Sequence, residues 1–240
     1  MMAITVGGQA GAGGIEIGRL VADHIDATYV QKQAIRRVAR DLDATVDAVV
    51  RKELAYYSRW KRFGHQVEAW LAQMGRTWAG DTWSTAGIYT TELMTGSERR
   101  DLPGLISDAE YKSSVFSVAE RYLTEGNVVL THRAGCLTLK DRPEAIHVGV
   151  FAPKDNRIAR VAYRYRIGNQ EAEEWVDTMD QARSAWFQHL ADQDPQDRSI
   201  YDLALDVADL GDENAARIVS QTAMEQRFGV ASDEHRTLPH

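Results

Sequence analysis

The sequence predicts an α/β protein in which a central parallel sheet lies between two layers of helices. Three observations lead to this prediction. A β-branched run at residues 4–6 passes through glycines into an amphipathic helix, and short apolar runs at residues 127–130 and 145–151 have the composition of buried strands. Helical patterns separate these strands, which favours parallel pairing with helices on both faces of the sheet. The length of 240 residues suits one medium domain with a substantial core.

A glycine-rich turn joins the first predicted strand to the first predicted helix. Residues 4–16 read ITVGGQAGAGGIE, and the helix that follows has apolar side chains on one face, at Ile17, Leu20, Val21 and Ile25. Such a turn directs unpaired backbone N–H groups and the positive end of the helix dipole toward one point, where an anion is stabilised. Two interpretations are open for this segment alone: a phosphate-binding loop and an ordinary glycine-rich turn.

The glycine-rich turn lacks the side-chain cation of a standard P-loop. That motif reads GxxxxGK[ST], with a lysine that reaches the β- and γ-phosphates and a hydroxyl that holds magnesium. Counted from Gly8, the lysine position is Gly14 and the hydroxyl position is Ile15. Backbone binding of phosphate is compatible with this change. The charge that stabilises a migrating phosphoryl group must therefore come from elsewhere in the chain.

The next segments predict a strand, a helix and an inserted helical region. Residues 27–30 read as a short strand, and residues 32–42 return to helical spacing. Residues 43–95 are rich in helix formers and aromatic side chains, which we expect to pack a helical insertion or an oligomer interface, with a minority stacking on a base. These aromatic residues are Tyr56, Tyr57, Trp60, Phe63, Trp70, Trp78, Trp83 and Tyr89.

Regular elements resume after a polar break at residues 98–103. Ser107 and Glu110 have the spacing of a capping box, which predicts a helix that ends near Gly126. The last third predicts, in order, a basic helix through Arg166, a helix capped by Asn169, a strand at residues 201–207, a helix from Asp212 and a mobile tail.

Composition limits the compartment and the partners. The formal net charge of -7 argues against nonspecific binding to nucleic acid or anionic membranes. Cys136 is the only cysteine, so an intramolecular disulfide is impossible and a thiol-based zinc site is not expected. Neither a signal peptide nor a membrane span is apparent, and we expect a soluble cytoplasmic protein. Its single domain would cover residues 1–230, with a core at 1–30 and 107–230, an insertion at about 31–106 and a tail at 231–240.

Two groups of arginines offer the missing cations. Arg133 directly follows a predicted strand, where ligands bind in sheets of this kind, and a guanidinium can grip a phosphate through two parallel hydrogen bonds. Arg157, Arg160 and Arg164 are spaced to share one helical face, and Arg183 lies on the next predicted helix. Two basic helices of this kind can fold over a nucleotide as a lid. Structural ion pairs and a solvated basic face are the alternatives.

With these segments assembled, the chain resembles the cytidylate kinase-like family, a divergent branch of the P-loop nucleoside monophosphate kinases. The segment ITVGGQAGAGGIEIGRLVADHI is similar to the family pattern ISRQxGSGGxEI and the helix after it. The segments NVVLTHRAG, RPEAIHVGVFAPKDNRIARV, VDTMDQARSAWF and YDLALDVADL follow in the family's order at comparable spacing. The resemblance implies a P-loop NTPase three-layer sandwich with a central parallel sheet, a helical monophosphate-binding insertion and a helical lid.

The resemblance also implies roles for individual residues. The phosphates of ATP would be bound by the loop residues Gly8, Gly11, Ala12, Gly13 and Gly14. Arg157 and Arg160 would contact the nucleotide at the start of the lid. Arg133 would grip the acceptor monophosphate, while Asp180 and Arg183 would close on the transferred phosphate.

The chain departs from the family pattern near the phosphates. The family usually has arginine where this chain has Gly8 and Ile15, and an acidic residue where it has Gln31. One well-placed group of this kind is worth on the order of 3 kcal/mol of transition-state stabilisation. Glu16 is retained, and the resemblance implies that it orients magnesium. An acidic side chain in the first turn of a helix is also favourable with the helix dipole alone.

The leading interpretation is a phosphotransferase that uses ATP and Mg²⁺ to phosphorylate a nucleoside monophosphate, with CMP or dCMP first by resemblance. Its partners would be small-molecule nucleotides, without nucleic acid or membrane, and the aromatic-rich insertion would support a homo-oligomer. An alternative is a nucleotide-binding regulatory or interaction protein without efficient chemistry, because positions 8, 14 and 15 carry no cation. A third interpretation is a kinase of a different small molecule.

Overall fold

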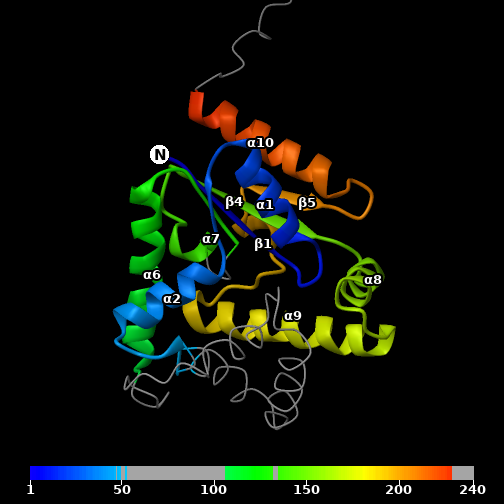
Figure 1. Cartoon of the computed structure of the whole chain (residues 1–240), viewed down its shortest axis with the longest axis horizontal. Coiled ribbons are helices and arrows are strands. Elements are labelled where there is room, and N and C mark those ends of the chain that lie inside the picture. Colours follow the sequence, from blue (N-terminus) through cyan, green and yellow to red (C-terminus); the bar gives the residue numbers. More distant parts are fainter. Residues whose placement is uncertain (47, 50–51, 53–105, 132–134, 229–240) are drawn as a thin grey trace, which may run out of the picture.

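A five-stranded parallel sheet forms the centre of the protein, with the strands in the order β2-β3-β1-β4-β5 (Figure 1). The computed structural model describes residues 1–46, 48–49, 52, 106–131 and 135–228. In these residues the strands are β1 Ala3–Gly8, β2 Thr28–Val30, β3 Val128–Leu130, β4 Ala145–Phe151 and β5 Leu203–Asp206. The predicted central parallel sheet is confirmed.

Strand β1 lies in the middle of the sheet because it pairs with both β3 and β4. Thr5 is level with Leu130 on one side and with His147 on the other. Since all five strands run in the same direction, the carboxyl ends of β1, β3 and β4 meet at one edge. Ligands of open parallel sheets bind at this edge, so the segments that follow these three strands position the site.

Helices cover both faces of the sheet and complete the predicted three layers. The helices are α1 Gly14–His24, α2 Lys32–Asp41, α6 Asp108–Glu125, α7 Gly135–Thr138, α8 Lys154–Tyr165, α9 Asn169–Ala191 and α10 Asp212–Phe228, and η2 Arg198–Ile200 is a 3-10 turn. Helices α1 and α10 pack together on one face. Helices α6, α7 and the second half of α9 cover the other face, and α2 packs on α6.

The alternation of side chains along β1 explains why two apolar cores form. Ile4 and Val6 are buried in the cluster that includes α1 and α10, whereas Ala3 is buried in the cluster that includes α6 and α9. Successive side chains of a strand point to opposite faces of the sheet, so one strand supplies both cores.

Helices α8 and α9 form a hairpin beside the carboxyl edge of the sheet (Figure 1). A third apolar cluster holds the two helices together, with Val161 from α8 and Trp175 and Val176 from α9. Ala10, in the segment between β1 and α1, belongs to the same cluster. The hairpin is therefore packed directly against the glycine-rich turn.

Most predicted helix ends agree with the structure, and two differ. The capping box is confirmed, because Glu110 N donates to Ser107 Oγ at 3.2 Å and Ser107 N donates to Glu110 Oε2 at 2.9 Å. The predicted cap at Asn169 is wrong: Gly168 is the N-cap of α9, and Asn169 is the first helical residue. Arg166 ends α8 instead of lying within it, because its backbone is left-handed, with φ of 55°.

Several predictions concern segments outside the described residues. The aromatic-rich region at 56–90, most of the expected insertion and the expected tail belong to these segments, so the oligomer interface expected there stays a prediction. Helix α2, which the sequence assigned to the insertion, packs into the core with α6. No helix in the described part of the chain has both the length and the apolar composition needed to cross a bilayer.

Candidate functional site

The turn between β1 and α1 presents an uncapped helix end at the carboxyl edge of the sheet. Gly13 is the N-cap of α1, and no side chain caps the first turn. Its φ of 98° is in the left-handed region that favours glycine. The helix dipole adds partial positive charge at this end, so the first turn of α1 is suited to bind an anion.

Gly8, the last residue of β1, has a backbone conformation and a close contact that favour glycine. Gly8 has φ of 102°, and a Cβ atom there would lie 2.0 Å from the carbonyl oxygen of Val150. No side chain fits at this point without movement of β4. The arginine that the family usually has here is therefore incompatible with this backbone.

Helices α8 and α9 hold the turn through the backbone of Ala10. Ala10 N donates to Asp180 Oδ1 at 3.0 Å, and Ala10 O accepts from Arg157 Nη1 at 3.0 Å. Gln9 adds a link to β4, because its Oε1 accepts from Ala152 N at 3.0 Å. The shape of the turn is thus set by contacts with three separate elements.

Arg157 is buried, and its guanidinium donates hydrogen bonds to protein groups and not toward the pocket. Its side chain is 7% exposed and donates to Asp180 Oδ2 at 2.6 Å and to Ala152 O at 3.1 Å, in addition to Ala10 O. Neither Arg157 nor Asp180 lines the pocket described below. The structure therefore brings these two predicted site residues together as a clamp on the turn.

Arg160, one turn further along α8, lies over the glycine-rich turn. Its Nη1 and Nη2 donate to the two carboxylate oxygens of Asp212, at 2.6 and 2.9 Å. These hydrogen bonds raise the pKa of Arg160, and burial opposes the shift. A Cβ atom at Gly13 would lie 2.6 Å from Arg160 Nη1, so glycine at position 13 also leaves room for this guanidinium.

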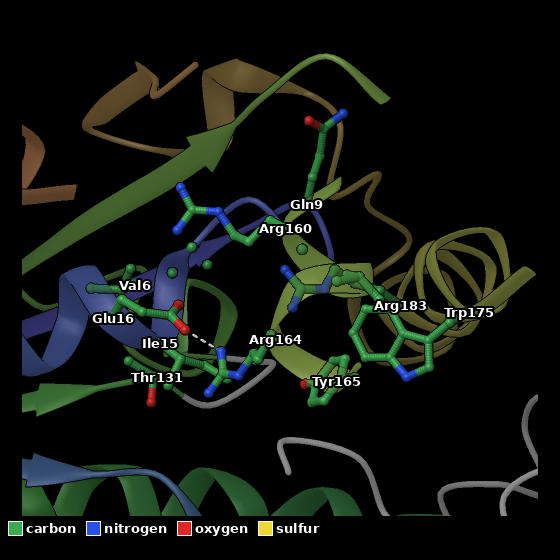
Figure 2. A pocket seen from close by; sticks show the side chains of 15 residues that line it. Val6, Gln9, Ile15, Glu16, Thr131, Arg160, Arg164, Tyr165, Trp175 and Arg183 are labelled. Carbon is green, nitrogen blue, oxygen red and sulfur yellow. Dashed lines mark hydrogen bonds and ion pairs between the residues drawn. The ribbon is translucent and has the colours of Figure 1, made fainter. Parts of the chain in front are cut away.

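Arg164, one more turn along α8, pairs with Glu16. Its Nη1 donates to Glu16 Oε1 in the first turn of α1, and both side chains are close to one-third exposed (Figure 2). Glu16, the residue expected to orient magnesium, therefore contacts a guanidinium in this structure. Arg164 belonged to the predicted basic face but was not among the predicted site residues.

Arg183 reaches the same pocket from α9. Its side chain is buried, and its guanidinium points toward the glycine-rich turn (Figure 2). Burial raises the pKa of the Cys136 thiol to about 12, and the charge of Arg183 opposes that shift. Asp180, which was expected to close on the transferred phosphate together with Arg183, binds Arg157 in this structure, and its role toward a phosphate stays a prediction.

The pocket is an open hollow between the turn, α8 and α9. Among the described residues, its charged lining consists of the guanidinium groups of Arg160, Arg164 and Arg183 and the carboxylate of Glu16. The remaining lining residues are Val6, Gly7, Gln9, Gly11, Gly13, Gly14, Ile15, Thr131, Val161, Tyr165 and Trp175. Three guanidinium groups beside an uncapped helix end stabilise several negative charges at once, as in a polyphosphate.

Aromatic side chains that the sequence analysis did not single out form one wall of the pocket. The rings of Tyr165 and Trp175 lie with their centroids 5.5 Å apart at an interplanar angle of 49°. Trp175 lies four residues before Met179 on α9, so the two share a helix face, and this spacing says nothing of a site beside it.

Arg133 lies outside the described residues, so its predicted contact with an acceptor phosphate stays a prediction. Thr131, two residues earlier, lines the pocket, and its hydroxyl donates to the Tyr29 hydroxyl at 3.0 Å.

The described residues do not fit a preformed metal site. Glu16 is the sole carboxylate among the pocket-lining residues that the structure describes, and it pairs with Arg164. The described residues also contain no cluster of three or more His, Cys, Asp or Glu that could hold a metal ion. Magnesium prefers an octahedron of oxygen ligands, and this lining supplies few of them.

The protein has a parallel sheet between two helical layers, and a glycine-rich turn joins the central strand β1 to a helix at the carboxyl edge. This arrangement is that of a P-loop type of fold. The chain matches the cytidylate kinase-like family over residues 3–209, and it belongs to that family. Membership supports a nucleotide kinase-like function with small nucleotide ligands. The comparison with curated proteins gave no match.

Two solved structures are similar to the chain. An uncharacterized protein from Eubacterium ventriosum is 15% identical, with 93% of this chain and 98% of that chain covered and a TM-score of 0.61. Shikimate kinase from Acinetobacter baumannii, in complex with shikimate, is 14% identical, with 95% and 94% covered and a TM-score of 0.41. At these identities the first likeness concerns the fold, and the second is too distant to add to it.

Proposed function

We propose that the protein is a cytoplasmic phosphotransferase that moves the γ-phosphoryl group of ATP to a nucleoside monophosphate, CMP or dCMP. The observation that carries this proposal is the convergence of Arg160, Arg164 and Arg183 on the uncapped first turn of α1. These cations come from the α8–α9 hairpin and stand in for the lysine that the turn lacks. Family membership supports the same class of reaction.

Phosphoryl transfer depends mainly on alignment and on stabilisation of charge. In the proposal, the phosphates of ATP lie on the backbone of residues 8–14. An acceptor phosphate oxygen attacks the γ-phosphorus, and the bond to the β–γ bridging oxygen breaks to leave ADP. Arg160 and Arg183 stabilise the charge on the transferring group, and Arg133 grips the acceptor phosphate.

Arg157 and Asp180 have an indirect role in this proposal. Both hold the backbone of Ala10, and they thereby fix the turn on which the phosphates lie. Magnesium is proposed as a cofactor that arrives with ATP, whose phosphate oxygens supply the ligands that the described pocket lacks.

Turnover of a panel of nucleoside monophosphates tests the proposal. A coupled assay that reports ADP should give the highest kcat/KM with CMP or dCMP. If folded protein forms no ADP above background with any acceptor, the protein is not a nucleoside monophosphate kinase. A screen of other small metabolites would then test for a different acceptor.

The substitution Arg133→Ala tests the acceptor site specifically. We expect the KM for the acceptor to rise by at least about tenfold, because a charge-assisted bidentate contact is lost, while ATP affinity changes little. Arg142→Ala is a matched control, since Arg142 pairs with Glu120 on the exposed surface and does not line the pocket. Equal loss of acceptor use and ATP binding would give Arg133 a different role.

A second candidate function is a nucleotide-binding regulatory protein without efficient catalysis. The geometry at Gly8 favours it, because no cationic side chain fits there, and two of the pocket arginines are already paired with carboxylates. Calorimetric titration with ATP separates the candidates. Tight binding without turnover supports the regulator, and no binding contradicts both.

A further inference from the structure

Helix α8 presents three arginines, and each pairs with a carboxylate from a different helix. Arg157 pairs with Asp180 of α9, Arg160 with Asp212 of α10, and Arg164 with Glu16 of α1. The three side chains are 7%, 31% and 28% exposed, in that order. Burial therefore separates Arg157, which solute cannot reach, from the other two, whose guanidinium groups line the pocket.

The Arg164 pair differs from the Arg160 pair in where its carboxylate lies. Glu16 is in the first turn of α1, and it lines the pocket together with Gly13, Gly14 and Ile15. Asp212 belongs to α10 and is not among the lining residues, although its Oδ1 would lie 3.1 Å from a Cβ atom at Gly13. The pair between Arg164 and Glu16 thus sits at the anion-binding end of α1, beside the position that carries lysine in a standard P-loop.

Charge makes Glu16 and a bound polyphosphate competitors. Both are negative, both are favoured by the dipole of α1, and both are ligands for a guanidinium. A polyphosphate on the first turn of α1 brings like charges close together, which is unfavourable while Glu16 keeps its place. The Arg164 side chain is partly exposed, so it can exchange one anion for the other.

We propose that Arg164 is a phosphate-binding cation of this turn and that Glu16 is its counter-ion, which a polyphosphate displaces. The inference rests on the proposed function, because it assigns roles within the same nucleotide site. It also gives Glu16 a different role from the expected one. Glu16 holds Arg164 at the mouth of the site instead of binding magnesium.

Calorimetric titration with ATP and with inorganic triphosphate, in EDTA and again with Mg²⁺, tests this assignment. We expect Arg164→Ala to weaken binding in EDTA by about tenfold, the value typical of one charge-assisted hydrogen-bonded contact. Glu16→Gln should tighten binding in EDTA several-fold, because the competing charge is removed while the shape is kept. In the double variant, the effect of Glu16→Gln should disappear, since it acts through Arg164.

Matched controls come from a surface pair of the same chemistry. Arg142→Ala and Glu120→Gln remove one charge each from an exposed pair outside the pocket, and neither should change the affinity for ATP or triphosphate. Arg164→Gln keeps much of the side-chain stem, so it gives the same test if Arg164→Ala does not fold. Thermal unfolding in each case shows whether the variant is folded.

Three outcomes overturn the assignment. If Glu16→Gln weakens the binding of ATP and triphosphate, and does so only with Mg²⁺, then Glu16 is a metal ligand. Unchanged binding by both single variants, while the unaltered protein binds ATP, would remove Arg164 from the site and leave the proposed function intact. Absence of ATP and triphosphate binding by the unaltered protein would defeat the assignment together with the proposed function. Binding without turnover leaves the assignment standing and favours the regulatory candidate.

Discussion

The two ends of helix α8 carry the same type of residue in different surroundings. At its start, Arg157 is buried and holds Ala10 and Asp180, whereas near its end Arg164 is partly exposed and faces the pocket. Both arginines pair with a carboxylate. The comparison teaches that the place where the guanidinium ends, and not residue type or pairing, decides which arginine can bind a ligand. Arg183 is as buried as Arg157, but its side chain lines the pocket.

The largest expected effect is on stability at the buried end. Arg157→Ala should lower the free energy of unfolding by about 3 kcal/mol, because it removes the donor to Asp180 Oδ2 and to the Ala10 carbonyl and leaves the carboxylate of Asp180 without its counter-ion. Denaturant unfolding measures this loss. An effect below about 1 kcal/mol would contradict the comparison, since it would make Arg157 no more structural than a surface residue.

A smaller effect is expected where the glycine-rich turn passes under Arg160. Gly13→Ala should destabilise the protein by about 1–2 kcal/mol, because alanine is strained at φ of 98°. It should also weaken ATP binding, since the added Cβ would push the Arg160 guanidinium aside. Gly168→Ala is the control: φ there is -69° and nothing lies within 4 Å of the added atom, so both measurements should stay unchanged.

A still smaller effect is expected at the middle of α8. Asp212→Asn should lower the free energy of unfolding by about 0.5–1 kcal/mol, since it weakens a partly exposed pair and removes an acidic residue from the first turn of α10. ATP affinity should not fall, because Arg160 stays available to phosphate. A fall of tenfold or more in calorimetry would show that Asp212 positions Arg160 for binding.

The smallest effect on stability is expected at the end of α8 that faces Glu16. Arg164→Ala should change the free energy of unfolding by less than about 1 kcal/mol, as is usual for exposed ion pairs. Denaturant unfolding at low and high salt measures it, and the small difference should shrink further with salt. A loss as large as that of Arg157→Ala would erase the contrast between the two ends.

The fold was predictable because its signals are local. The glycines after β1 and the capping box of Ser107 and Glu110 follow from short-range backbone chemistry. The spacing of Arg157, Arg160 and Arg164 predicted that they share one side of α8. In the structure, all three pair with carboxylates close to the glycine-rich turn. Asn169 was misplaced by one residue because Gly168 takes the N-cap conformation without any side-chain cap.

The site was less predictable because its contacts join distant segments. Periodicity shows which arginines share a face, but it does not show how deep each one lies. The partner of Asp180 is Arg157, 23 residues away on another helix, and no spacing rule links them. The pairing of Arg164 with Glu16 spans 148 residues and depends on how α8 packs over α1.

The backbone at Gly8 restricts how this turn can change by substitution. Because a Cβ there would meet the Val150 carbonyl at 2.0 Å, an arginine cannot be introduced at position 8 by one replacement without rebuilding the end of β1. Ile15 is different, since it is half-buried, lies in the first turn of α1 and lines the pocket. Of the two positions where the family usually carries arginine, only position 15 can gain a cationic side chain by a single substitution that leaves the backbone as it is.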